Sequence, residues 1–403
     1  MTTVFDQNAA EFKANPYLYL ESLREIAEIV PAGGAGTHVI LSYELVKQVI
    51  ADSTLSVRYI PEHISKIANS EIPGLKNLGK FAIVFTDPPN HQRLRRLHMN
   101  VFNSKIINNF NVDIQKIITN VLDQIEYDCA IDIVSQLADQ IPRTVLSSLL
   151  GIRTGHQQEI TDLLLSVRTL LEPTHITPRK LKRLEVEFQR CTELLQKNID
   201  AYRQCPKNNF ISLLLQQGSQ NQKLTDEELQ VSCALTYIAG HETTKALISS
   251  AAMLFAEFPK QWDILIADKS RIPAAIEEVI RYEPPLHFTT RLATKDFELG
   301  LQKINKGDLI LLCLASANRD RDIFTNPSNF DVCRESPGNL SFGLGMHNCI
   351  GKHLAQSEVR LLIETMIDLN VRFHKNQDYK MKWANMGPTT RSLEVLQLHL
   401  TRG

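Results

Sequence analysis

The spacing of hydrophobic and polar residues predicts that most of this chain is helical. In residues 8–29, the apolar positions, Ile26 among them, recur at helical spacing and fall on one face. Residues 43–51 carry a second helical pattern. Residues 53–85 show little regular periodicity, and long irregular segments in compact enzymes are often binding loops. We therefore expect residues 53–85 to contact a substrate.

The middle of the chain, residues 105–217, is mostly helical by the same criterion, with two breaks. One break lies near residues 151–155. The other spans 172–178, contains two prolines and joins two helices, so it is a candidate lid. The basic run 179–183 follows it. Such a run is either a solvated helix face or a dock for an anionic substrate or an acidic carrier protein.

A long helix is predicted to begin after Thr225 and to continue to about residue 258. Thr225 and Glu228 form a capping-box pattern at its start. The middle, residues 238–244, combines a glycine with adjacent polar residues, although a mid-helix glycine costs about 1 kcal/mol relative to alanine. Local inconsistency of this kind is expected at functional sites. The alternative is a kinked helix in which Thr243 is hydrogen-bonded back to a carbonyl.

Shorter alternating segments predict a strand-rich part near both ends of the chain. No repeat, low-complexity segment or linker divides the sequence, so we expect residues 1–403 to form one domain. Its class would be mainly α with a minor β part. Strands are expected at residues 38–42, 286–294, 299–301 and 309–313 and within 370–403, with a turn near 386–390.

Composition narrows the class of protein. The 403 residues are 43% hydrophobic and 22% charged, which is typical of a soluble globular protein, and the formal net charge of −1 argues against general nucleic-acid binding. Without a signal-peptide pattern or an apolar run of membrane-spanning length, we expect a cytoplasmic monomer with no membrane anchor. Seven scattered cysteines without a Cys-x-x-Cys pair argue against a zinc ribbon or a disulfide framework.

Residues 341–355 carry the most distinctive chemistry. Cys349 lies in a glycine-rich loop just before a predicted helix over 350–368, where the helix dipole and unpaired backbone N–H groups favour thiolate over thiol. A thiolate is a nucleophile or a metal ligand. The glycines permit positive φ and the close approach of a large flat group, and they dominate the loop of His347, the nearest candidate base. Thiolate and bare backbone together suggest a planar macrocycle such as haem; the alternative is a buried structural cysteine.

Two further segments carry paired charges. A helix begins in residues 87–96, with prolines in its first turn, and places His91 and Arg95 four residues apart on one face. That face is either solvated or directed at anions such as the two haem propionates. Glu278 and Arg281 lie three residues apart on another predicted helix and form either a surface pair or a buried one.

The run Phe-Gly-x-Gly-x-His-x-Cys-x-Gly-x-x-Leu-Ala, from Phe342 to Ala355, resembles the haem-ligand signature of the cytochrome P450 superfamily without departure. Four more motifs occur in the family's order: Asp-Pro-Pro-x-His-x-x-x-Arg, Ala-Gly-x-Glu-Thr, Glu-x-x-Arg and an arginine in the following strand. The resemblance covers nearly the whole chain. It implies the cytochrome P450 fold, with a helix-rich body, a long central helix and a small β-rich region.

The resemblance also implies the role of each motif residue. Cys349 would be the axial ligand of haem b iron, and Glu242 and Thr243 would pass protons to bound dioxygen. Glu278 and Arg281 would form a buried structural pair. Haem contacts are implied for His91, Arg95, Ala239, Gly240, Arg291, Phe342, Gly343, His347, Cys349 and Gly351, with His91, Arg95, Arg291 and His347 at the propionates. Substrate contacts are expected from Leu235, Ile238, Ala239, His287, Phe288, Thr289 and Thr389.

The function implied is that of a soluble, bacterial-type haem-thiolate monooxygenase that inserts one oxygen atom of O2 into a C–H bond. Electrons would come from NAD(P)H through a reductase and a ferredoxin or flavodoxin. This partner would dock nearest Cys349, where Arg96, Lys352 and Arg360 could supply positive charge. One alternative is a peroxide-driven haem enzyme or an isomerase on the same fold, which could dispense with proton delivery. The other is a non-catalytic haem protein, a carrier or gas sensor.

The substrate is less well defined by the sequence. The expected contact segments, 53–85, 165–185, 286–290 and 386–390, are mixed in character and carry no single charge clamp. A medium-sized, largely apolar molecule of secondary metabolism, a fatty acyl chain or a carrier-bound amino acid would all fit.

Overall fold

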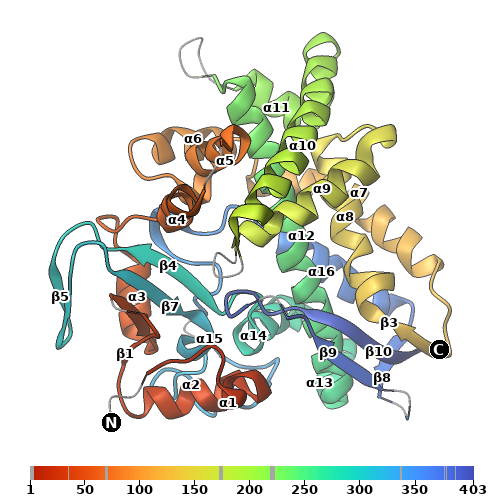
Figure 1. Ribbon diagram of the computed structural model, residues 1–403. Coiled ribbons are helices and arrows are strands. Elements are labelled where there is room, and N and C mark those ends of the chain that lie inside the picture. The colour runs from red at the N-terminus through yellow and green to blue at the C-terminus, as the bar shows by residue number, and fades with distance from the viewer. Residues whose placement is uncertain are drawn as a thin grey trace.

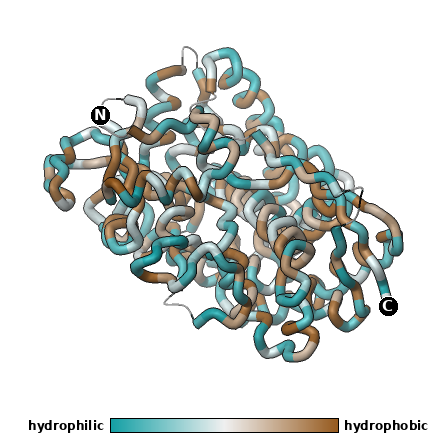
Figure 2. The backbone as a smooth tube through the Cα atoms, turned by 90° about the horizontal axis from the view of Figure 1, so that it is seen from below, coloured by the Kyte–Doolittle hydropathy of each residue, from teal (hydrophilic) through white to brown (hydrophobic). Residues whose placement is uncertain are grey.

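The computed structural model describes residues 4–34, 36–68, 71–171, 176–217, 223–335, 338–375, 377, 379–385 and 387–403. Helices form most of the molecule, and small sheets lie toward two of its sides (Figure 1). Hydrophobic and hydrophilic residues alternate along the chain, as expected for elements that bury one side (Figure 2). The helices are α1 (Ala10–Ala14), α2 (Pro16–Arg24), α3 (Tyr43–Ala51), α4 (Tyr59–Ile67), α5 (Pro73–Phe81), α6 (Asn90–Met99), α7 (Ser104–Asp123), α8 (Gln140–Leu150), α9 (Gln157–Val167), α10 (Pro178–Gln204), α11 (Phe210–Gln216), α12 (Asp226–Glu257), α13 (Pro259–Ala267), α14 (Ile272–Tyr282), α15 (Leu314–Ala317) and α16 (Lys352–Asp368).

The strands of the described residues form two four-stranded sheets and one hairpin. The first sheet has the order β1-β2-β7-β4, in which β2 and β7 run parallel and the other pairs antiparallel. In the second, β10 pairs with β3, β8 and β9. The strands are β1 (Ile29–Pro31), β2 (Thr37–Ile40), β3 (Cys129–Asp132), β4 (Phe288–Leu292), β5 (Phe297–Leu299), β6 (Gln302–Ile304), β7 (Leu309–Cys313), β8 (Val371–His374), β9 (Lys380–Trp383) and β10 (Leu393–Arg402).

The first sheet is covered on both faces because successive side chains of a strand point to opposite sides. Ile40 and Leu312 belong to a buried cluster with residues of α3. Their neighbours Val39 and Cys313 belong to another cluster, with residues of α1 and α2. The sheet thereby fixes β4, which carries Arg291 opposite Ile310 of β7.

α12 is the central helix of the molecule, and Figure 1 shows it running behind α10 and among the other helices. Its N-terminus has the predicted capping box: Glu228 N donates to Thr225 Oγ1, and Thr225 N donates to Glu228 Oε2 at 3.0 Å. Most of its side chains are buried in the large apolar cluster that also contains residues of α5, α8, α10 and α14. Because α12 is packed on most sides, it holds the residues of its middle in fixed positions.

Several elements predicted from the sequence agree with the structure. The helix over 43–51 and the strand at 309–313 have the predicted bounds, as α3 and β7. The predicted break at 151–155 begins where Gly151 ends α8 with a φ of +77°. The predicted helix over 350–368 begins two residues later, as α16. The alternating segment over 370–403 contains β8, β9 and β10.

Other predictions were wrong. Residues 53–85 contain α4 and α5, each nine residues long with a proline near its start, so their apolar positions span too few turns to reveal a period. Of the predicted strand at 299–301, Leu299 ends β5, but the other two residues form the turn to β6, where Gly300 has a φ of +58°. Ile26 lies beyond the end of α2 and is 65% exposed. The short strand β3 was not expected within 105–217.

Two predicted features lie partly outside the described residues. These are residues 172–175 of the candidate lid and residue 386 of the expected turn. In the part of the chain that is described, every helix is too short or too polar to cross a membrane.

Candidate active site

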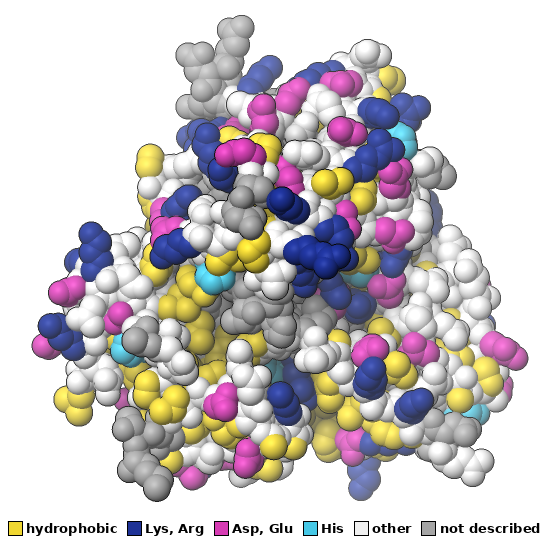
Figure 3. Space-filling model, viewed as in Figure 1, with side chains coloured by type: hydrophobic (Ala, Val, Ile, Leu, Met, Phe, Trp, Pro, Cys, Tyr) yellow, Lys and Arg dark blue, Asp and Glu magenta, His cyan; other side chains and the backbone are white. Residues whose placement is uncertain are grey.

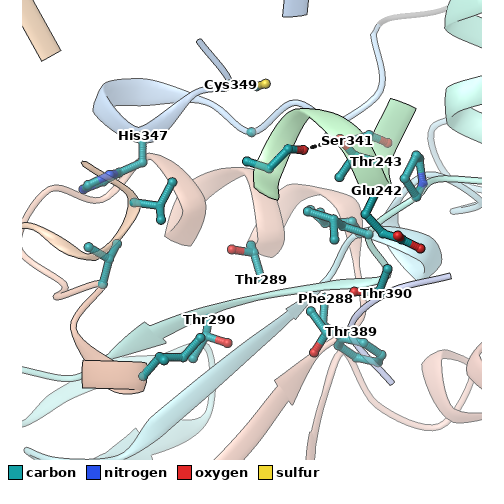
Figure 4. Close-up of a pocket in the computed structure, with 18 of the residues that line it drawn as sticks. Glu242, Thr243, Phe288, Thr289, Thr290, Ser341, His347, Cys349, Thr389 and Thr390 are labelled. Atoms are coloured by element: carbon teal, nitrogen blue, oxygen red, sulfur yellow. Dashed lines mark hydrogen bonds between the residues drawn. The ribbon is translucent and has the colours of Figure 1, made fainter. Parts of the chain in front are cut away.

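A cavity of about 1330 Å³ lies between α12, the Cys349 loop and β4. Figure 4 shows Cys349 and His347 on one side of it, and Phe288, Thr289, Thr290, Thr389 and Thr390 across from them. Glu242 and Thr243 of α12 lie at one end (Figure 4). The structure therefore brings together residues from four distant parts of the sequence.

The Cys349 loop is shaped by its glycines. Gly343 and Gly345 have φ values of +67° and +68°, which favour glycine, and a Cβ on Gly345 would lie 3.3 Å from Ala51 Cα. Between them and Cys349 lies the short turn η7 (Gly345–His347), and Cys349 N donates to Phe342 O at 2.7 Å. The loop thus presents Sγ to the cavity just before α16.

The exposed surface of Cys349 faces the cavity, and protein atoms surround the rest of the side chain. Burial is the largest influence and raises the pKa of the thiol. Backbone N–H groups of Gly351 and Lys352 and the charge of Arg95 act in the opposite direction. The expected preference for thiolate is therefore outweighed by burial, and a bound metal ion would be needed to displace the proton.

Three basic side chains gather on one side of the cavity. The rings of His91 and His347 have centroids 4.0 Å apart, and His91 is buried with neither ring nitrogen hydrogen-bonded to a described residue. Burial, His91 and Arg291 lower the pKa of His347 to about 3. Burial lowers the pKa of Arg291 to about 10, while its Nη2 donates to Ile50 O at 2.9 Å. Arg291 is the cation of this group, whereas the lowered pKa of each histidine keeps it neutral. An anion bound here would offset the buried guanidinium and could accept hydrogen bonds from the imidazoles.

Arg95 also lines the cavity, but its donors are engaged by the cysteine loop. Arg95 Nη1 donates to Asn348 O at 2.6 Å, and Nη2 donates to the side chain of Asn348. The sequence predicted Arg95 at a propionate. In this structure it supports the loop that holds Cys349, and the part played by Asn348 had no signal in the sequence.

Glu242 is held by two cations that sequence reasoning missed. Its carboxylate pairs with Arg168 of η4 (Arg168–Leu171) and with Lys245 Nζ at 3.2 Å. Burial acts to raise the pKa of Glu242, but Lys245 and Arg168 outweigh it and the pKa falls below its usual value. Glu242 is therefore a carboxylate at neutral pH. Arg168 ends an ordinary amphipathic helix, so nothing in the sequence distinguished it.

Thr243 Oγ1 donates to Ala239 O at 2.6 Å, the back-bonded arrangement weighed as an alternative. It occurs without interrupting α12. Ala239 and Gly240 both line the cavity. A Cβ on Gly240, however, would lie 3.0 Å from Leu146 Cδ2 of α8, so this glycine also allows α8 to approach α12.

Most of the predicted substrate residues line the cavity, but His287 does not. Neighbours in an extended segment point to opposite sides, and Leu286 and Phe288 occupy the cavity side. His287 is buried instead, with Nε2 3.3 Å from Tyr17 Oη. The predicted cofactor and substrate residues among the lining are His91, Arg95, Leu235, Ile238, Ala239, Gly240, Phe288, Thr289, Arg291, Phe342, Gly343, His347, Cys349, Gly351 and Thr389.

The predicted contact segments also reach the cavity. Residues 57, 59, 60 and 83–85 line it from the first segment, and residues 168, 169 and 180 from the second. Residues 388–390 line it from the last. Residues 4–8, 33 and 34 near the N-terminus also line it and were not predicted, because nothing in their composition distinguishes them from surface turns.

Glu278 and Arg281 form the buried pair. Arg281 Nε donates to Glu278 Oε2 at 2.7 Å, and Nη2 donates to Oε1 at 2.8 Å. Arg334 donates to the same carboxylate, and Arg281 also donates to three backbone carbonyls of the segment 318–329. The cluster anchors the turn-rich passage that leads to the cysteine loop.

The three cations predicted at a partner surface are Arg96, Lys352 and Arg360. Lys352 Nζ lies 3.0 Å from Glu277, and Arg360 Nη1 lies 2.9 Å from both oxygens of Glu364. Arg96 is exposed.

These features fit a haem. Cys349 offers one sulfur ligand, and nowhere in the described chain do three His, Cys, Asp or Glu side chains meet to hold a bare metal ion. The remaining ligands would have to come from the bound group itself, as in a macrocycle. A Cβ on Gly351 would lie 4.0 Å from Cys349 Sγ, so its absence leaves space beside the sulfur. The unpartnered His91 and the cation Arg291 would meet the propionates.

Comparisons with known proteins agree with this geometry. A sequence model of the cytochrome P450 family matches residues 29–262 and 271–389. A biotin biosynthesis cytochrome P450 of Bacillus subtilis (strain 168) is 29% identical over 371 residues, which cover 91% of this chain and 92% of the relative. Nocardicin C N-oxygenase of Nocardia uniformis subsp. tsuyamanensis is 29% identical over 339 residues, 83% of this chain and 82% of the relative. The solved structure of P450BioI in complex with hexadec-9Z-enoic acid ligated acyl carrier protein has a TM-score of 0.88 at 26% identity, and covers 98% of this chain and 100% of that chain. The chain belongs to the cytochrome P450 family.

Proposed function

We propose that this cytochrome P450 monooxygenase oxidises a C–H bond of a medium-sized, largely apolar small molecule in secondary metabolism. The observation that carries the proposal is that Cys349, the pair Glu242 and Thr243, and a mainly apolar wall line one cavity. Bound haem supplies the activation of O2 that is common to the family. The residues of this chain hold the cofactor, move protons and position the substrate.

Cofactor binding is assigned to two groups of residues. Cys349 would ligate the iron, and Arg291, His91 and His347 would bind the propionates. Arg95 would act through Asn348, which it holds beside the ligand loop. Binding an anion would raise the pKa of His347, because the charges that now lower it would be neutralised.

Proton delivery is assigned to Glu242 and Thr243. Thr243 Oγ1 has committed its proton to Ala239 O, so toward the cavity it can only accept a hydrogen bond. Thr243 would therefore orient a water or another donor. Glu242 is deprotonated, so it would take a proton from solvent and transfer it to that donor after leaving its cation partners.

The substrate end of the cavity supports an apolar ligand. Leu235 and Ile238 of α12 face Phe288 and Thr289 of β4 across it, and the threonines offer hydrogen bonds without a charge. Among the described lining residues, Glu242 and Asp6 are the acidic ones. An apolar molecule with one or two neutral polar groups matches this wall.

For electron supply we propose NAD(P)H, a reductase and a ferredoxin or flavodoxin. The partner would dock near the cysteine loop, with Arg96 as the first cation to test, because Arg96 is exposed and follows Arg95, which contacts that loop. Reversal of the charge at Arg96 should raise the apparent dissociation constant of the partner. An unchanged dissociation constant would show that the partner docks on another surface.

A carrier-bound substrate is the second candidate. Lys180 lines the cavity at the start of α10, and Arg179, Lys182 and Arg183 beside it are exposed. Figure 3 shows Lys and Arg side chains near the centre of this face, close to hydrophobic ones. P450BioI has been solved with an acyl carrier protein ligated to a fatty acid. An acidic carrier protein would suit these charges.

The thiolate ligand is tested by spectroscopy of the reduced carbon monoxide complex. A thiolate-ligated haem gives a strongly red-shifted Soret band, and Cys349→Ser should remove the shift. A red-shifted band that persists in Cys349→Ser would overturn the assignment. Dioxygen-dependent turnover with NAD(P)H and redox partners would support the monooxygenase, whereas turnover with peroxide alone would support the peroxide-driven alternative.

Charge reversal tests the carrier. Lys182→Glu should weaken binding of a carrier-bound acyl chain and leave binding of the free acid unchanged. Lys197→Glu, farther along α10 and outside the cavity lining, serves as the matched control. Equal effects of both variants would point to a general charge effect and against docking at the start of α10.

A further inference from the structure

A second cavity, of about 390 Å³, lies among α2, the end of α14, β9 and the segment around α15. None of its described lining residues also lines the large cavity. Three aromatic and three basic side chains line it, together with Glu21, Glu283 and nine smaller or apolar residues, whereas the wall of the active-site cavity is mainly apolar. The residues that define it are Tyr17, Tyr282, Glu283, Arg319, Trp383 and Arg391.

Two arginines lie over aromatic rings in this cavity. The guanidinium carbon of Arg319 lies 3.5 Å from the Tyr17 ring centroid and 3.9 Å from that of Tyr282. The guanidinium carbon of Arg391 lies 3.5 Å from the centroid of Trp383. Contact with a ring face restrains the guanidinium, and its N–H groups can still donate to other groups.

Some of these N–H groups have no partner among the residues that the structure describes. Arg319 Nε and Nη2 both donate to Tyr282 O, and Arg391 Nε donates to Glu283 Oε1 at 3.0 Å. Within the described residues, Arg319 Nη1 and both Nη atoms of Arg391 have no hydrogen bond, and Arg319 has no carboxylate within 4.0 Å. A rigid guanidinium edge of this kind matches the two oxygens of a carboxylate.

The one acid in the lining that faces these arginines is already neutralised by its neighbours. Glu283 accepts hydrogen bonds from Tyr17 Oη at 2.8 Å and from Arg391. Burial acts to raise the pKa of Glu283, but His287 and Arg391 outweigh it and lower the pKa to about 2. Burial also lowers the pKa of His287, so the histidine is neutral. Arg391 offsets Glu283, the other lining acid Glu21 pairs with Arg321, and Arg24 pairs with Asp320. Among the described lining residues, Arg319 is then the cation that has no carboxylate within 4.0 Å.

Apolar side chains border the two arginines. Leu18 is 63% exposed and Met381 is 41% exposed, and both line the cavity. An inorganic anion gains no binding free energy from these apolar side chains. An organic anion would bury them under its own apolar group. We propose that this second cavity is a binding site for a small carboxylate that carries a short apolar or aromatic group.

The site adjoins the active-site wall without being part of it. Arg391 N donates to Pro285 O at 2.8 Å, and Leu286 pairs with Thr390, which line the large cavity from the other side. The two cavities can therefore be told apart experimentally, because only a ligand in the large one is expected to displace solvent from the iron. The inference does not depend on the identity of the substrate.

Calorimetric titration of the haem-loaded full chain with benzoate tests the proposal. Benzoate should bind with a stoichiometry of one, and neutral benzamide should bind about tenfold more weakly or not at all, because it lacks the charge. Met381→Glu places a like charge at the border and should weaken benzoate about tenfold or more. Lys380→Glu, on the opposite face of β9, is the matched control and should change the affinity by less than about threefold.

Arg391→Gln should also abolish binding, with a thermal melt to establish that the variant is folded. If Arg391→Gln fails to fold, Met381→Glu still tests the proposal, because Met381 is exposed and its replacement should leave the fold intact. Three outcomes would overturn the proposal: no benzoate binding, equal binding by wild type and Met381→Glu, or a spin-state shift of the ferric haem with the same dissociation constant. Phosphate binding as tight as that of benzoate would also overturn the proposal, because it would show that the apolar group of the ligand contributes nothing to binding.

Discussion

The carboxylate of Glu242 in α12 is paired with the guanidinium of Arg168 in η4, the turn that follows α9. The proposed proton donor is therefore tied to the element that immediately precedes the 172–178 segment. Lys245, one helical turn along α12, supplies the second cation. Delivery of a proton from Glu242 requires these contacts to loosen, so the rate of proton delivery should depend on Arg168.

Replacement of Arg168 by glutamine should raise the pKa of Glu242. Arg168 and Lys245 both hold that pKa below its usual value, and removal of one cation lets burial act more strongly. The acid limb of the pH dependence of turnover should move to higher pH. Arg190→Gln, which removes an exposed pairing with Glu159, is the control and should leave the limb in place. Glu242→Gln should lower turnover about 100-fold or more.

Arg291→Gln should weaken haem binding more than any change at Arg95. Arg291 is buried on a strand at the cavity wall, whereas Arg95 is only half-buried and supports Asn348, so water screens the charge of Arg291 less than that of Arg95. A hydrogen bond to a charged group contributes about 1.5–3 kcal/mol, so transfer of haem to an acceptor globin should accelerate roughly tenfold or more.

Arg143→Gln is the control for that transfer experiment. Arg143 is partly buried and paired with Asp139, but it does not line the cavity. Faster haem loss from Arg143→Gln than from Arg291→Gln would contradict the assignment of Arg291 to a propionate.

Gly240→Ala should destabilise the protein through Leu146. Alanine improves helix propensity by about 1 kcal/mol, but overpacking costs about 1–3 kcal/mol, and the new Cβ would lie 3.0 Å from Leu146 Cδ2. Urea unfolding of Gly240→Ala, Leu146→Ala and the double variant forms a cycle. We expect Gly240→Ala to be less costly, or even stabilising, when Leu146 is alanine. Strict additivity would show that the two side chains do not meet.

Glu283 should contribute stability that depends on pH. Its pKa is about 2 in the folded chain and 4.5 as the ordinary value, so the unfolded chain binds a proton at higher pH than the folded chain does. The contribution, about 3 kcal/mol, is fully present above pH 4.5 and is lost as the pH falls toward 2. Between pH 5 and 3.5, the unfolding free energy of the wild type should therefore fall more steeply than that of Glu283→Gln. Parallel curves would refute this assignment.

Much of the fold was accessible from periodicity and capping alone. α12 could be predicted because a capping box and thirty residues of helical pattern agree, and its polar centre marks the cavity wall. α4, α5 and β3 could not be predicted, because short elements depend on tertiary contacts. β3, for example, consists of four residues stabilised by pairing with β10. The assignment of one domain to the whole chain stays a prediction.

The site was less accessible than the fold. The motifs identified Arg95 and Glu242, but the sequence contained no signal for their partners Asn348 and Arg168, which meet them only through tertiary packing. The placement of His287 was wrong because alternation along the extended segment turns it away from its neighbours Leu286 and Phe288. The residues that carry the chemistry occur in short sequence motifs, whereas the charges that shift their pKa values come from distant segments.

The parallel pairing of β2 with β7 bears on how the protein is made. His38 Nε2 lies 3.0 Å from Asp308 Oδ2, although the two residues are 270 positions apart in the chain. β2 leaves the ribosome early but has no parallel partner until Cys313 has been synthesised. Contacts so distant in sequence form slowly, and the unpaired edge is open to misassembly in the meantime. The strand that carries Arg291 pairs with β7 as well, so the basic wall of the cavity is completed late in biosynthesis.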